Sequence, residues 1–179
     1  MKNLLPALAL IGAPFFFGFS GSAPVQKERA SPADTARYDK GGVKIEVAYS
    51  KPYKKGRVIF GGLVPFDEVW RTGANEAATF TTNKDLMIGG KKLPAGKYTL
   101  WTIPHQKNWE VIFNKKMYPW GIGRDGKASR EADSDAASVT VPVEVLPKEM
   151  EQFTINVQGD KVPTLVFAWD RTQVSVPLK

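Results

Sequence analysis

The sequence predicts an all-β protein, a single-domain antiparallel β-sandwich of jelly-roll-like type with about nine or ten strands. Three observations support this class. In many short runs, apolar and polar residues alternate with a period of two, which is typical of half-buried strands. Turn-forming residues separate these runs at intervals of roughly 8–12 residues, and no stretch has the spacing of an amphipathic helix. A chain of 179 residues, of which 42% are hydrophobic, is long enough for one domain with its own core.

Residues 1–22 have the order of a secretory signal peptide. A short basic start at 1–3 precedes an apolar run at 4–19, and small residues follow at 20–23. The apolar run is too short for a membrane helix and contains two prolines. We therefore expect an exported chain, periplasmic or secreted, with no membrane span in the mature protein.

The chain divides into three predicted parts, which are a signal peptide at 1–22, a polar leader segment at 23–41 and the β-sandwich domain at 42–179. The leader is mixed in charge and shows no alternation, so we expect it to pack along the domain. Cleavage is expected between about Gly21 and Val25, because the small residues after Phe19 are the part of the chain that suits a signal peptidase.

The strands of the domain follow from the alternation and from the turns between them. Gly89 and Gly90 predict a two-residue hairpin, since both can adopt positive φ. The run at 97–103 is apolar on both faces and should be central, whereas Pro142 indicates an edge or a bulge. The predicted strands, in chain order, are residues 43–49, 78–82, 86–88, 97–103, 109–113, 139–145, 153–157, 165–169 and 174–176.

Composition excludes several classes of site. Without cysteine there is no disulfide framework, thiol nucleophile or Cys-ligated metal, and with His105 as the one histidine there is no three-histidine zinc site. The acids between Asp125 and Asp135 lack the order of a calcium loop, so neither a metal nor a cofactor is predicted. The net charge of +7 suggests anionic surroundings such as a cell envelope, and nucleic acid is not an expected partner of an exported chain without a reading module.

Several strings in the chain go beyond generic strands. They include Lys-Gly-Arg-Val-Ile-Phe-Gly at 55–61, Trp-Arg-Thr-Gly-Ala-Asn-Glu at 70–76 and Leu-Pro-Ala-Gly-Lys-Tyr-Thr-Leu at 93–100. Over about residues 31–177 the chain resembles a bacterial exported family catalogued as domain of unknown function 2911, and the string at 70–76 is the most specific part. The resemblance implies an all-β exported domain. It brings no established activity, so no catalytic residue is carried over. Phe66 departs from the tyrosine expected there.

The densest group of polar residues is the string at 70–76, which also contains Trp70. Arg71 offers a planar fork for a carboxylate or phosphate, and Asn75 can both donate and accept hydrogen bonds. Glu76 could pair with Arg71 or act as a general base. Three interpretations remain open, which are a structural turn with Arg71 and Glu76 paired, a ligand pocket, and a catalytic site.

Two features of the middle of the chain bear on this choice. Trp120, between proline and glycine, is the tryptophan expected to be exposed, whereas Trp101, Trp109 and Trp169 are expected to pack in the protein. The Gly-x-Gly-x-x-Gly string at 121–126 lacks the strand before it and the helix after it that a nucleotide site requires.

The sequence thus favours a non-catalytic module that binds a ligand or associates with the cell envelope, with a site at Trp70, Arg71, Asn75, Glu76 and Trp120. Its candidate partners are an anionic small molecule, a glycan or an envelope protein. The alternative is a hydrolase of envelope glycans that uses a carboxylate pair, with Glu76 and a second acid such as Asp67.

Overall fold

The computed structural model describes residues 29–179, so the predicted signal peptide at 1–22 and the first residues of the leader lie outside the described part. Residues 29–179 contain strands and loops, one short 3-10 turn, η1 (Ala132–Ser134), and no α-helix. The nine strands are β1 (Ala33–Lys40), β2 (Val43–Ser50), β3 (Thr79–Thr82), β4 (Leu86–Ile88), β5 (Lys91–Leu93), β6 (Gly96–Pro104), β7 (Asn108–Asn114), β8 (Asp135–Gln158) and β9 (Thr164–Pro177). The all-β prediction is confirmed.

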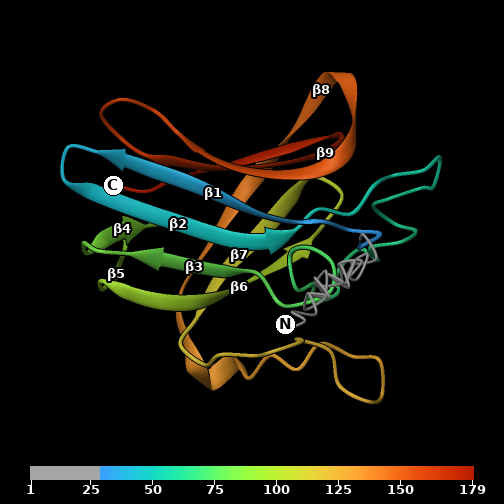
Figure 1. Ribbon diagram of the computed structural model, residues 1–179, viewed down its shortest axis with the longest axis horizontal. Helices are drawn as coiled ribbons and strands as arrows, with labels where there is room; N and C mark the ends of the chain where they lie inside the picture. Colours follow the sequence, from blue (N-terminus) through green and yellow to red (C-terminus); the bar gives the residue numbers. More distant parts are fainter. Residues whose placement is uncertain (1–28) are drawn as a thin grey trace, which may run out of the picture.

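Seven strands form one antiparallel sheet in the order β1-β2-β3-β6-β7-β8-β9, and β4 and β5 form a separate hairpin. The sheet curls so that β1 and β2 lie against the far halves of β8 and β9 (Figure 1). The Tyr49 hydroxyl of β2 accepts a hydrogen bond from the Ile155 amide of β8 at 2.9 Å across the two layers. The result is sandwich-like and antiparallel, as predicted. Its strands follow chain order as a meander, which differs from the crossovers of a jelly roll.

The last two strands are longer than the sequence predicts. The predicted runs at 139–145 and 153–157 are both parts of β8, which has 24 residues. The strand pairs with β7 as far as Pro142 and with β9 from Val143 onward. Pro142 therefore stands where β8 changes neighbours, a place that suits a residue without an amide hydrogen. Irregular register beyond Val145 lets the strand bend and continue.

The first strand lies within the segment predicted to be a polar leader. Residues 33–40 form β1, which pairs with β2 along its whole length at the edge of the sheet. Tyr38 is the one buried side chain of β1. An edge strand needs few apolar residues and carries charges such as Arg37 and Asp39, so its alternation is weak in the sequence.

Two hydrophobic clusters lie on opposite faces of the central strand β6. The main cluster fills the curl of the sheet and contains Trp109 and Trp169. The smaller cluster, made of Ala77, Trp101, Ile112 and Tyr118, covers the outer face. Burial on both faces of β6 confirms its predicted central place, and the packing predicted for the three tryptophans is confirmed as well.

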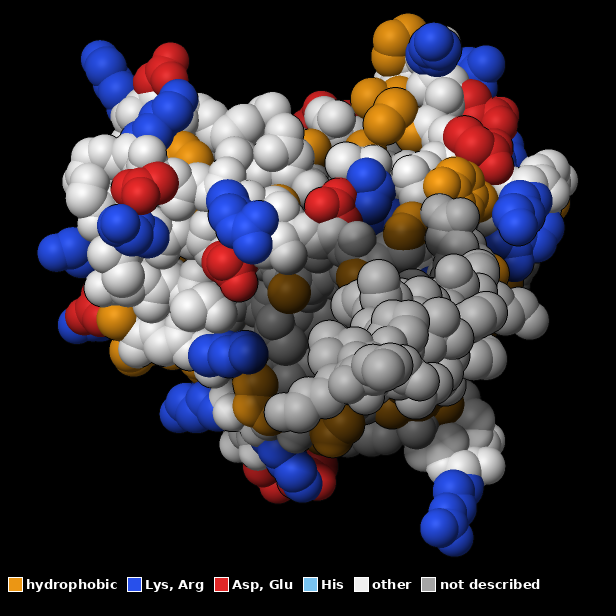
Figure 2. All heavy atoms as spheres, viewed as in Figure 1, with side chains coloured by type: hydrophobic (Ala, Val, Ile, Leu, Met, Phe, Trp, Pro, Cys, Tyr) orange, Lys and Arg blue, Asp and Glu red, His pale blue; other side chains and the backbone are white. Residues whose placement is uncertain are grey.

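The predicted hairpin is confirmed, and charged side chains form exposed pairs on the surface. Gly89 and Gly90 join β4 to β5 with φ of 56° and 81°, values that few other residues adopt. Lys and Arg side chains are spread over the face shown in Figure 2 and alternate with acids. Pairs such as Lys40–Asp160 and Lys92–Asp85 are exposed, which fits solvated charge around the strand ends.

Candidate functional site

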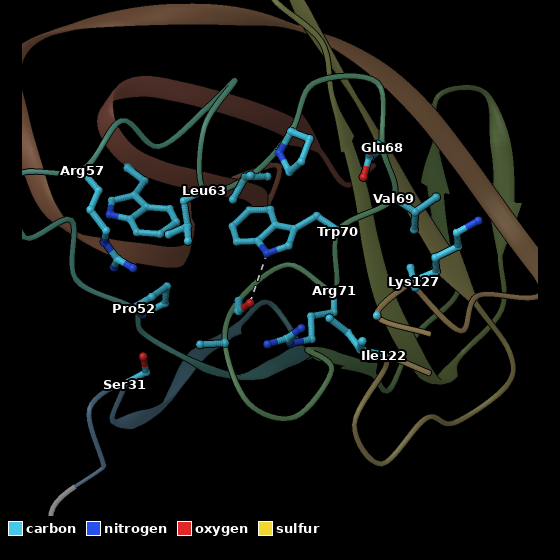
Figure 3. Close-up of a pocket in the computed structure, with 17 residues that line it drawn as sticks. Ser31, Pro52, Arg57, Leu63, Glu68, Val69, Trp70, Arg71, Ile122 and Lys127 are labelled. Atoms are coloured by element: carbon cyan, nitrogen blue, oxygen red, sulfur yellow. Dashed lines mark hydrogen bonds between the residues drawn. The ribbon is translucent and has the colours of Figure 1, made fainter. Parts of the chain in front are cut away.

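A cavity of about 740 Å³ lies where the segment at 51–76 meets the loop between β7 and β8 (Figure 3). Figure 1 shows both segments on the side of the sheet away from the β4–β5 hairpin. Of the predicted site residues, Trp70 and Arg71 line the cavity, and Asn75, Glu76 and Trp120 do not. The described lining residues are Ser31, Pro52, Arg57, Leu63, Val64, Pro65, Glu68, Val69, Trp70, Arg71, Gly73, Ala74, Ile122, Gly126, Lys127, Ala128 and Trp169.

Trp70 fastens the first wall of the cavity to the sheet. Its backbone exchanges hydrogen bonds of 2.8 and 3.0 Å with Thr102 of β6. Its indole packs against the rings of Trp169, Phe153 and Trp109, and its Nε1 donates to the Gly73 carbonyl at 3.1 Å. The wall at Trp70 is therefore apolar, because its one polar atom is already bonded within the protein.

The turn after Trp70 has an unusual backbone. Thr72 is buried with φ of 58°, and Asn75 has φ of 58°. A β-branched residue rarely adopts positive φ, and such residues persist where surrounding contacts hold them. Thr72 is held by hydrogen bonds to the Thr102 hydroxyl at 3.2 Å and to the Trp70 carbonyl at 3.4 Å. The turn thus presents Arg71 in a fixed position.

Arg71 lies in the cavity wall without an acidic partner among residues 29–179. Its Nε is enclosed and has no hydrogen-bond acceptor. The guanidinium carbon is 6.0 Å from the centre of the exposed Trp120 ring, a cation–π contact that holds the group at the cavity. Burial lowers the pKa of Arg71 from its usual value, yet the side chain stays charged at neutral pH.

Glu76 and Asn75 form hydrogen bonds with the segment before β1. The Glu76 carboxylate accepts hydrogen bonds of 2.8 and 3.0 Å from Arg29, so the pairing of Glu76 with Arg71 considered above does not occur. Asn75 donates to the Ser31 carbonyl at 3.1 Å. A hydrogen bond from its own amide and then Arg29 hold the pKa of Glu76 below its usual value. These two residues fasten the segment before β1 to the turn.

The second wall is a small hairpin at 121–129. The Gly123 amide bonds to the Lys127 carbonyl at 2.8 Å, and the Ser129 amide bonds to the Gly121 carbonyl at 3.0 Å. The Gly-x-Gly-x-x-Gly string therefore forms a hairpin with no helix directly after it, which differs from the strand–turn–helix arrangement of a nucleotide site. Tyr118 anchors its base by packing edge-on against Trp101 at 5.2 Å.

Three charged lining residues escape the sequence prediction. Arg57 donates to the backbone carbonyls of Tyr53 and Lys54 at 2.5 and 3.0 Å. In Figure 3, Arg57 and Arg71 lie toward the Pro52 side of the cavity, and the amine of Lys127 points the other way. Glu68 is the one acid among the described lining residues.

A signal for two of these residues is present in the sequence. Arg57 belongs to the string at 55–61 that carries the family resemblance, and Lys127 directly follows the glycine-rich string at 121–126. The sequence does not show that either string lies near Arg71, because this depends on how the fold brings both segments beside the same turn.

The acids of the hydrolase alternative lie elsewhere. Asp67 is exposed and contacts the Nδ1 atom of His105, and Glu76 is bonded to Arg29. Neither lines the cavity, where Glu68 has no second acid opposite it among the described residues. Across residues 29–179, no three His, Asp or Glu side chains come together as a metal site, and no helix there could cross a membrane.

The fold and the site together define the class of protein, an all-β chain whose curled sheet has, at one side, a cavity lined by apolar and basic side chains. The family model described as a protein of unknown function, DUF2911, matches residues 31–178, and the chain belongs to this family. The resemblance read from the strings at 55–61, 70–76 and 93–100 is thereby confirmed. No curated protein and no solved structure matches the chain.

Proposed function

We propose that this protein is an exported, non-catalytic binding module that takes a small amphipathic molecule into the cavity between the 51–76 segment and the hairpin at 121–129. The observation that carries the proposal is the cavity itself. Its volume of about 740 Å³ lies in the range of small-molecule sites, and its walls combine apolar side chains with a few polar groups.

The arrangement of acids favours binding over hydrolysis. A glycoside hydrolase needs two carboxyl groups on either side of the bond that breaks. Glu68 is alone in the described lining, while Asp67 and Glu76 are engaged with His105 and Arg29. We therefore do not propose the hydrolase, and the module is proposed to hold its ligand unchanged.

The proposed compartment is the periplasm or the exterior of the cell. It is supported by the signal-peptide order of residues 1–22 and by the excess of basic residues, which suits anionic envelope surroundings. A small molecule is favoured over an envelope protein as partner, because the site is a concave cavity rather than a flat apolar patch.

The proposal is tested with N-phenyl-1-naphthylamine, a neutral dye that fluoresces in apolar sites. The mature exported chain should bind one dye molecule. Ala74→Trp places an indole in the lining and should weaken dye binding at least tenfold, whereas Ala95→Trp, at an exposed turn, should leave it unchanged. Thermal melts of both variants check the fold. Absence of saturable dye binding by the parent, or equal binding by folded Ala74→Trp, would refute the proposal.

A further inference from the structure

We propose that the ligand is an amphipathic anion, with a carboxylate or phosphate head group on an apolar body. We propose further that Arg71 binds this head group. This inference rests on the proposed binding function and specifies the chemical class of the ligand. It follows from three properties of the cavity, which are the unmatched charge of Arg71, the balance of charge around it and the apolar character of the remaining wall.

Arg71 is a charged donor group in need of an acceptor. Its guanidinium has five N–H donors and accepts no hydrogen bonds. The enclosed Nε has no acceptor, and no acid of residues 29–179 forms an ion pair with it. The two terminal nitrogens of Arg71 are not enclosed in this way and have no hydrogen bond to residues 29–179, so a ligand that supplies acceptors can reach them. A planar carboxylate or a phosphate matches the fork of the guanidinium.

The charges around Arg71 favour an anion as well. Arg57 and Lys127 also line the cavity, against the single acid Glu68. Arg57 is held in place by two backbone carbonyls on the 51–57 segment, so its position costs little to maintain when a ligand arrives. The two guanidinium groups on the Pro52 side of the cavity raise the local concentration of anions and oppose the binding of cations.

The rest of the wall suits an apolar body better than a sugar. The Trp169 ring lies nearly parallel to Trp70, at 19° and 6.1 Å between centroids, so that side of the indole is covered. The indole N–H groups of Trp70 and Trp169 donate to carbonyls of the protein. The hydroxyls of a sugar would find few partners beside Pro52, Leu63 and Ile122, and unpaired hydroxyls weaken binding.

Four ligands with the same chain test the class, each used below its micelle concentration. They are octanoate, octyl phosphate, octan-1-ol and octyl glucoside. Calorimetry on the mature chain at low salt should give octanoate or octyl phosphate an affinity at least tenfold above those of the alcohol and the glucoside, as expected for hydrogen bonds to a charged group. Whichever of octanoate and octyl phosphate has the higher affinity shows whether the site prefers a carboxylate or a phosphate head group.

Two arginine variants assign the head group to its residue. Arg71→Met should lose at least tenfold in affinity for the better anion and change less than about twofold for octan-1-ol. Arg124→Met removes an exposed arginine of the same hairpin, outside the lining, and should change neither. If Arg71→Met fails to fold, Arg57→Gln, at an exposed position, should weaken only the anions, by about threefold or more.

The outcomes separate this inference from the proposed function. If the dye binds and the four octyl ligands bind alike, the cavity is a binding site and the inference about an oxyanion is wrong. The inference is equally wrong if folded Arg71→Met keeps the full preference for anions. If neither the dye nor any octyl ligand binds, the proposed function itself fails.

Discussion

Replacing Gly121 by alanine tests whether the hairpin wall of the cavity is seated on the sheet. A Cβ atom at Gly121 would lie 2.9 Å from the Ala77 Cβ, 3.2 Å from the Trp101 ring and 3.3 Å from the Arg71 Cβ. None of these is the end of a flexible side chain, so relief requires movement of the backbone. Gly126, in the same hairpin, has a similar φ of 79° and nothing within 4 Å of its Cβ position.

The two glycines separate backbone strain from packing. Both residues have positive φ, so alanine at either position costs roughly 1–2 kcal/mol. Only Gly121→Ala adds overpacking, at roughly 1–3 kcal/mol. The free energy of unfolding should therefore fall by about 1–2 kcal/mol in Gly126→Ala and by about 2–5 kcal/mol in Gly121→Ala. For a domain of this size, each kcal/mol lowers the melting temperature by about 2–4 °C.

The measurement is urea unfolding of the parent and both variants, monitored by tryptophan fluorescence. An equal dependence of the free energy of unfolding on urea concentration shows that the same folded state unfolds in all three. Because the added Cβ atom would also press against the Arg71 Cβ, Gly121→Ala should weaken dye binding as well. Equal losses of stability in the two variants would show that the base of the hairpin is not packed against Ala77 and Trp101 as described.

Three further predictions concern single groups and processing. Glu76→Gln should lower stability by less than about 1 kcal/mol in thermal melts, because Glu76 and Arg29 are 46% and 57% exposed, and a loss above about 2 kcal/mol would contradict this. Burial raises the pKa of Tyr49 above its usual 10.0, so this hydroxyl contributes stability below about pH 10 that is lost as the pH rises further. In urea unfolding at a series of alkaline pH values, the free energy of unfolding of Tyr49→Phe should therefore fall less steeply with pH than that of the parent, and an equal fall would refute this. Intact mass of exported protein should show a first residue between about Gly21 and Val25, and a chain that still begins at Met1 would overturn the signal-peptide prediction.

The strands in the middle of the chain were predictable because their signal is local. In β6, apolar residues on both faces indicate burial on both faces, and the strand does lie between two hydrophobic clusters. The hairpin at Gly89 and Gly90 is equally local, since the turn depends on the φ angles of two adjacent residues. Such features depend on neighbours within a few positions, which the sequence shows directly.

Features that depend on a distant neighbour were not predictable in this way. β1 is polar enough to resemble a leader segment and is a strand because β2 pairs with it along its length. The runs at 139–145 and 153–157 are one strand because β8 changes partner from β7 to β9 and continues. Pairing of this kind is set by the sheet as a whole, and the local alternation is the same in either case.

The candidate site shows the same division. The sequence singled out the string at 70–76 as a dense group of polar residues, and of the five candidate site residues only Trp70 and Arg71 line the cavity. Only the tertiary structure decided that Glu76 bonds to Arg29, and that Arg57 and Lys127 share a cavity with Arg71. The choice of partner for a charge depends on which segments the folded sheet brings within hydrogen-bond distance, and residues 29, 57, 76 and 127 are far apart in the chain.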